Sequence, residues 1–170
     1  MSFPIIRRRQ VGSRYPPGPM VDCEPPRHES CSTMSSSQSC QDLLANLNPT
    51  LSPDPWIFAA IAEAAPGLSE DHSIFALIRE DEGLTAIRPA TPDDARGNRP
   101  LFARITLQVH SDLEAVGLTA AVSGALAAQN LCANIVAGLN HDHLFVPYQR
   151  GEEALLCLRK ISAAASAGQT

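Results

Sequence analysis

Aromatic side chains are scarce in this chain, at 5% of its 170 residues, although 44% of the residues are hydrophobic. We therefore expect a core built mainly from Ala, Leu, Ile and Val. Basic side chains are also few: Lys160 is the sole lysine, and the formal net charge is −5. Nucleic acids and anionic membrane surfaces attract proteins with a basic stripe, so we expect neither as a partner. A chain of this length fits one ordinary domain.

The chain also lacks the cysteine pattern of a disulfide framework. Its five cysteines are odd in number and form no CxxC pair. No obvious signal sequence points to an oxidising compartment, and we expect a cytoplasmic protein. Cys132 and Cys157 lie in apolar segments and are predicted to be buried thiols.

Formal charge is absent between Glu114 and Asp142. The uncharged segment is long enough for a membrane-spanning helix, but Thr, Ser, Gln and Asn residues interrupt it, and Ala and Gly dominate its first half. We predict a helix followed by a strand there, and no membrane span. The glycines lie scattered inside the predicted elements and form no phosphate-binding loop, so we expect no cofactor.

Along the chain, clusters of proline, serine and arginine predict that residues 1–37 form a disordered tail. Residues 40–92 are predicted to form a first, incomplete unit. It contains a helix over 41–47, an extended proline-rich connector, a strand over 56–61 and a hairpin of strands 73–79 and 84–89. A polar linker over 90–100 leads to a second unit over 101–162, and residues 163–170 are expected to be a flexible C-terminus.

The second unit has the clearer pattern. Residues 102–109 alternate between apolar and polar side chains, as in a half-buried strand. Ser111 and Glu114 have the spacing of a capping box and predict a helix from Ser111 to about Gln129. Strands over 134–139 and 144–148 and a helix over 151–162 follow. This order predicts an α+β, ferredoxin-like fold with an antiparallel sheet and helices on one face, completed by a strand from the first unit.

That topology places two polar turns at the same end of the sheet. They consist of His110, Ser111 and Asp112 and of His141, Asp142 and His143. A helix that starts there exposes unpaired N–H groups, which suit a carboxylate or a phosphate. The carboxylates of Asp112 and Glu114 would repel an anion, although they are also ordinary residues for a first helical turn. A ligand with both a carboxylate and an ammonium group, such as a free amino acid, fits the mixture.

Two catalytic interpretations compete with ligand binding. The three histidines, with Asp112 or Asp142, are the residue types of a zinc site, but an HxH turn is a weak signal. Ser111 beside a histidine resembles part of a nucleophile and base pair, yet no GxSxG elbow accompanies it. We therefore predict no metal site and no catalytic residue.

Three segments together resemble a family of short, uncharacterised proteins built from two ACT-like units. They are Arg79–Thr85 (REDEGLT), His110–Val122 (HSDLEAVGLTAAV) and Asn134–Pro147 (NIVAGLNHDHLFVP), within a resemblance that covers residues 43–160. The family is similar to the regulatory halves of aspartate kinases and to cytosolic arginine sensors. The resemblance implies a βαββαβ fold and amino-acid binding beside a strand-to-helix turn. Its site residues map to Ser111, Asp112, Leu113, Glu114, Ala115, Val116 and Gly117, and the chain departs from the family at Asp112, Leu139 and Asn140.

The leading hypothesis is therefore a non-catalytic regulatory protein that binds a small molecule, a free amino acid, at the residues above together with His110, His141 and His143. A homo-oligomer or an effector protein would be its further partner. The alternative is a structural or protein-interaction module that associates through its sheet without a small ligand.

Overall fold

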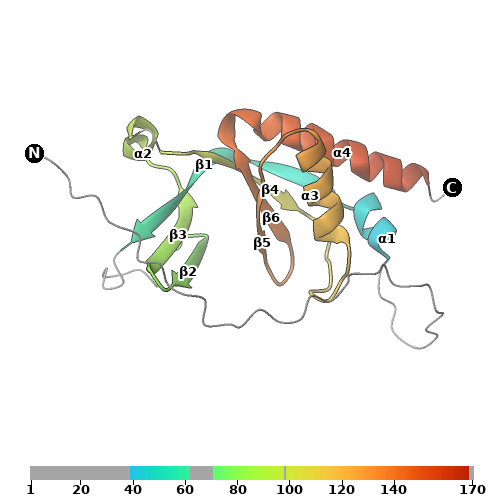
Figure 1. Ribbon diagram of the computed structural model, residues 1–170, viewed down its shortest axis with the longest axis horizontal. Coiled ribbons are helices and arrows are strands. Elements are labelled where there is room, and N and C mark those ends of the chain that lie inside the picture. The colour runs from blue at the N-terminus through green and yellow to red at the C-terminus, as the bar shows by residue number, and fades with distance from the viewer. Residues whose placement is uncertain (1–38, 62–70, 98, 169–170) are drawn as a thin grey trace, which may run out of the picture. The chain divides into compact units, whose positions relative to one another are not determined.

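The computed structural model describes residues 39–61, 71–97 and 99–168, so the predicted disordered tail over 1–37 lies outside the described residues. One antiparallel sheet of six strands, in the order β2-β3-β1-β4-β6-β5, organises the fold (Figure 1). None of the helices in the described ranges is long and apolar enough to cross a membrane.

The first half contributes α1 (Cys40–Ala45), β1 (Pro49–Ile61), β2 (Ala76–Glu80), β3 (Gly83–Pro89) and α2 (Pro92–Arg96). A capping box between Ser39 and Asp42 starts α1. The hairpin of β2 and β3 is confirmed, with Glu80 paired to Gly83. The proline-rich connector is instead the first part of β1. Pro49 opens that strand and Pro53 lies within a register shift, positions at which a missing N–H disrupts no ladder.

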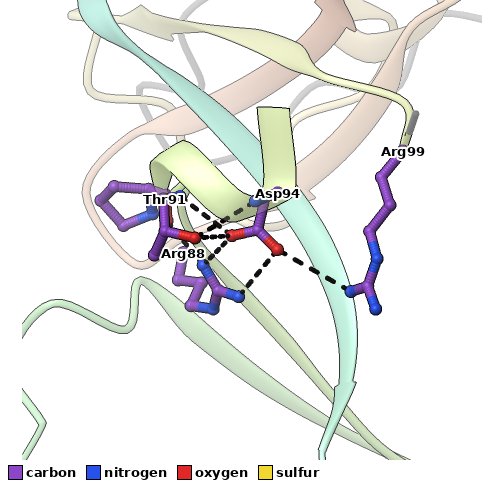
Figure 2. A network of polar contacts seen from close by, with 5 residues as sticks. Arg88, Thr91, Asp94 and Arg99 are labelled. Atoms are coloured by element: carbon purple, nitrogen blue, oxygen red, sulfur yellow. Dashed lines mark hydrogen bonds and ion pairs between the residues drawn. The ribbon is translucent and has the colours of Figure 1, made fainter. Parts of the chain in front are cut away.

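The predicted linker over 90–100 contains the short helix α2. Thr91 and Asp94 form its capping box, and Arg88 binds the Asp94 carboxylate at 2.8 Å. Figure 2 shows this carboxylate between Thr91 and Arg88, with Arg99 at 3.9 Å on its other oxygen. The hydrogen bonds from Arg88 and then Thr91 hold the pKa of Asp94 far below its ordinary value. The network fixes the chain between β3 and the second half.

The second half contributes β4 (Phe102–Leu107), α3 (Leu118–Ala128), β5 (Asn134–Ala137), β6 (Asp142–Pro147), a short 3-10 helix (Tyr148–Arg150) and α4 (Gly151–Ala167). The order of strand, helix, strand, strand, helix is confirmed. The last helix continues to Ala167, because the alanine-rich segment after Ser162 extends it, so residues 163–167 are helical and not a flexible C-terminus.

Strand β1 completes the sheet of the second half, as predicted. Its first residues, Pro49–Leu51, pair antiparallel with β4, which gives the ferredoxin-like strand order β1-β4-β6-β5. The later part of β1, from Trp56, pairs with β3 and gives the related order β4-β1-β3-β2. Strand β1, the first of the N-terminal half, is thus the outer strand of the C-terminal set, and β4, the first of the C-terminal half, is the outer strand of the N-terminal set.

The two faces of the sheet carry different side chains. The helices α1, α3 and α4 pack on one face (Figure 1), over a core that holds Ile105, Leu144 and Leu158 at 0% exposure. The opposite face carries aromatic rings, among them Trp56 and Phe145. Cys157 is half-buried. Cys132 is exposed, so the prediction that Cys132 is a buried thiol was wrong. This residue follows α3 at the surface of the protein.

Candidate functional site

The two predicted polar turns meet at one end of the sheet. The rings of His110 and His141 lie 4.7 Å apart between centroids, although the residues are far apart in sequence. Beside them lies a cavity of about 70 Å³, here called the rim cavity. It is lined by Ser111, Asp112, Leu113, Ala115, Leu118, Thr119, Ala137 and Asp142. The predicted juxtaposition of these turns is therefore confirmed.

The segment before α3 folds differently from its prediction. No helix starts at Ser111, because the Asp112 side chain accepts the backbone N–H of Glu114 at 3.0 Å. The Asp112 carbonyl then accepts the N–H of Ala115 at 2.9 Å. This local turn replaces the capping box of Ser111 and Glu114, since an Asp side chain that binds the backbone two residues on competes with helix formation.

Helix α3 begins only after Gly117, whose φ of +104° few residues other than glycine adopt. Gly117, at the N-cap, has no side chain with which to cap this end of the helix. The first backbone N–H groups of a helix have no acceptor within the helix. Leu118 and Thr119, which carry two of these groups, line the rim cavity. The predicted amide donors are therefore present, but they come from the residues after Gly117.

Residues with carboxylate side chains line the same cavity as Leu118 and Thr119. Asp142, paired in register with Ala137 on β5, is half-buried, and burial raises the pKa of its carboxyl group. Asp112 also lines the cavity. The Nδ1 atom of His141 is buried and has no hydrogen-bond partner among the described residues. The end of the sheet thus combines helix amides, carboxylates and an unsatisfied imidazole nitrogen.

Several predicted site residues lie outside the cavity. His143 faces the other side of the sheet, where its Nδ1 is 3.0 Å from the Thr106 hydroxyl and its ring lies 4.7 Å from the ring of Phe75. Glu114 is exposed, Val116 is 89% exposed, and Gly117 acts through its backbone. Sequence reasoning missed Leu118, Thr119 and Ala137 as lining residues. Ala137 could have been found, because it pairs with Asp142 in the hairpin of β5 and β6.

The alternation of side chains along β6 places His143 on the face opposite Asp142 and separates it from His110 and His141, whose rings lie together. Within the described ranges, no group of three His, Cys, Asp or Glu side chains is placed to hold a metal ion.

The loops around the rim cavity expose large apolar side chains. Leu113 is 67% exposed and Leu139 is 79% exposed, and Val116 belongs to the same loop as Leu113. Ordinary ligand pockets enclose about 300 Å³ or more, several times the volume of this cavity. The described chain therefore offers a pocket for a small polar group, with apolar surface beside it.

Comparison with known proteins identifies the family of the chain. The model of the ACT domain matches residues 35–102, which run from before α1 to the first residue of β4. A solved crystal structure is that of a Vibrio cholerae protein of unknown function, described as a possible transport protein. The sequence of this protein is 36% identical to that of the chain. The match covers 70% of this chain and 92% of that one, with a TM-score of 0.59.

Two further solved structures are more distant. An Agobacterium tumefaciens protein has 16% identity, coverage of 64% of this chain and 81% of its own, and a TM-score of 0.47. The aspartokinase alpha and beta subunits have 12% identity, coverage of 66% and 95%, and a TM-score of 0.47. No curated protein matches the chain significantly. The family match over the first half and the identity to the Vibrio protein over most of its length together show that the chain belongs to the ACT domain family.

Proposed function

We propose that this chain is a non-catalytic regulatory protein that binds a free amino acid at the rim cavity. The observation that carries the proposal is that the start of α3, which has only a glycine at its N-cap, and the half-buried residue Asp142 line the same small cavity. Membership of the ACT family supports a regulatory, ligand-binding role of this kind.

The chemistry of the cavity fits the two charged groups that every free amino acid carries. The N–H groups of Leu118 and Thr119 would receive the α-carboxylate, because the N-terminal end of a helix favours negative charge. The carboxylates of Asp112 and Asp142 would receive the α-ammonium group. A volume of about 70 Å³ suits these backbone groups. The ligand side chain would then extend over Leu113 and Leu139, so we favour an apolar amino acid.

Regulation would follow from differential binding. A ligand that joins the loop over residues 110–117 to the hairpin of β5 and β6 favours conformations in which the two lie together, and it shifts their population by its difference in affinity. An effector protein that recognises this end of the sheet would then sense the ligand.

The proposal is tested by thermal unfolding in the presence of each of the twenty amino acids. A ligand selective for the folded state stabilises by RT ln(1 + [L]/Kd), about 2.7 kcal/mol at a hundredfold excess over Kd. We expect one or a few amino acids to raise the melting temperature by several degrees. Asp142→Asn should abolish this shift, and Asp81→Asn, at the exposed tip of the hairpin of β2 and β3, should leave it unchanged. No shift with any amino acid at millimolar concentration would reject the proposal.

A second function is favoured by one observation. Strand β2 lies at the edge of the sheet and exposes Leu77 (43%) and Ile78 (39%). An apolar edge strand invites pairing with another chain, so an interaction module that associates through its sheet is the alternative. Size-exclusion chromatography with light scattering tests it. A dimer that Leu77→Lys converts to a monomer would support it, and a monomeric wild-type protein would reject self-association.

A further inference from the structure

The face of the sheet opposite the helices holds nearly all the aromatic side chains of the fold. Trp56, Phe58, Phe75, Phe102 and Phe145 belong to one cluster, here called the aromatic face. Its rings meet edge to face, with centroids 5.8 Å apart for Trp56 and Phe75 and 5.7 Å apart for Phe75 and Phe145. This surface is separate from the rim cavity, which lies on the helix side of β5 and β6.

Arg104, in the middle of β4, projects into the aromatic face. Its guanidinium carbon lies 4.0 Å from the centroid of the Trp56 ring and 5.1 Å from that of Phe75. The register shift in β1 makes room for it: Leu51 pairs with Ile105 and Pro55 with Ala103, so the three residues 52–54 lie opposite Arg104 alone. The Arg104 side chain is therefore already positioned by its contacts within the sheet, without a ligand.

Arg104 differs from the arginines of the described chain that form close ion pairs. Arg88, Arg96 and Arg150 each have a carboxylate oxygen within 2.8 Å. The Arg104 side chain has no ion pair or hydrogen bond with a described residue, and its Nε atom is buried without a partner among these residues. Stacking on rings satisfies the faces of a guanidinium but not its N–H groups. A partly buried charge is ordinarily paired, because leaving it unpaired is costly.

The charges around Arg104 indicate what it can bind. Burial lowers the pKa of Arg104, and Asp54, an exposed residue of the bulge, raises it. His143, the other basic group on this face, has its pKa lowered by burial, then by Arg104 and by His141, so its charged form is disfavoured. The site therefore offers one positive charge, which suits a monoanion better than a phosphate dianion.

We propose that Arg104 binds the carboxylate of a small aromatic acid on the aromatic face. The planar guanidinium presents pairs of N–H donors that match the two oxygens of a carboxylate. The stacked position on Trp56 fixes the orientation of this fork. The partly exposed rings of Phe58, Phe75 and Phe102 then lie beside the bound group, and an aromatic ring gains edge-to-face contacts there that an aliphatic chain does not.

Trp56 makes this proposal directly measurable, because it is the only tryptophan of the chain. Its indole N–H donates to the Ser52 hydroxyl at 3.2 Å, and it should give a single indole signal in a proton–nitrogen NMR spectrum. We expect benzoate, titrated into the full chain, to shift this signal saturably with a dissociation constant on the order of 1 mM. The pKa of His143, read from its ring protons, should rise on binding, because a bound anion offsets the charge of Arg104.

Matched ligands and variants separate this binding from other effects. Benzamide has the same ring without the charge, acetate has the charge without the ring, and inorganic phosphate is the dianion; all three should bind at least about tenfold more weakly than benzoate. Arg104→Lys keeps the charge but loses the fork, and Arg104→Met removes both. Each should weaken benzoate binding by about ten- to a hundredfold, whereas Arg159→Met, on the exposed side of α4, should not.

Each outcome decides the proposal. Benzoate binding that survives in folded Arg104→Lys would overturn the role of Arg104, and equal binding of benzamide would overturn anion recognition. Equal binding of acetate would overturn the aromatic class, and no saturable shift in the wild-type protein would overturn the site itself. Asp142→Asn should leave benzoate binding intact, so failure at this site and failure of the proposed amino-acid site are distinguishable.

Discussion

Replacing Gly117 with alanine should destabilise the protein, whereas the same replacement at Gly124 should stabilise it. Gly117 has a φ of +104°, and an added Cβ would lie 3.1 Å from the Sγ atom of Cys40. Backbone conformations of this kind cost about 1–3 kcal/mol in a residue other than glycine. Gly124 lies inside α3, and a Cβ there meets no atom within 4 Å. Alanine is favoured over glycine by about 0.5–1 kcal/mol inside a helix.

The two variants should therefore differ in free energy of unfolding by about 1.5–4 kcal/mol. Urea denaturation followed by far-ultraviolet circular dichroism measures the difference, provided that the m-value stays constant. The comparison also tests where α3 begins. A helix that started at Ser111 would make Gly117 an interior position, and alanine would then stabilise both sites. A Gly117→Ala variant at least as stable as the wild type would refute the helix start described here.

Further predictions concern packing and acid sensitivity. Gly151→Ala should cost about 1–3 kcal/mol in urea denaturation, because the new Cβ would lie 2.7 Å from the Cβ of Ala103. Arg88 holds the pKa of Asp94 below its ordinary value, so the stabilisation from this carboxylate should be complete above about pH 4 and be lost as the pH falls further; Asp94→Asn should flatten that dependence. Burial lowers the pKa of His143, so stability should fall as the pH drops below about 6.5, and His143→Gln should remove this part.

Each of these predictions has a contradicting result. A Gly151→Ala variant with wild-type stability would mean that α4 does not approach β4 as closely as described. An acid-unfolding curve unchanged by Asp94→Asn would deny that its ion pair contributes to stability. A ring titration that places the pKa of His143 at or above 6.5 would show that this imidazole is not held neutral by its surroundings.

Much of the fold was predictable because side chains along a strand with one buried face alternate between apolar and polar residues. The alternation along β4 placed Ala103, Ile105 and Leu107 on the helix face, and all three are buried there. From that strand and the order of the elements, chain topology alone brought the loop after β4 to the hairpin of β5 and β6. The meeting of His110 and His141 followed from connectivity and needed no knowledge of side-chain packing.

The features that escaped prediction depend on competition between local signals or on tertiary contacts. Ser111 and Glu114 have the spacing of a capping box, but Asp112 between them forms its own turn and Gly117 fixes the helix start. Thr91 and Asp94 have the spacing of a capping pair, but they lie in a polar segment with strong helix breakers, whose composition predicts a linker. The position of Arg104 on Trp56 was not legible, because the two residues meet only through the register of β1 and β4.

The proposed function depends most on ligand binding at the start of α3. The most direct test is a proton–nitrogen NMR titration of the full chain with the amino acid that stabilises it best. We predict the largest changes at the backbone N–H groups of Leu118 and Thr119, with smaller changes at Ala137 and Asp142 across the cavity and none at the indole of Trp56. Saturable changes that spare α3 and centre on another surface, or no changes at all, would contradict the proposed site.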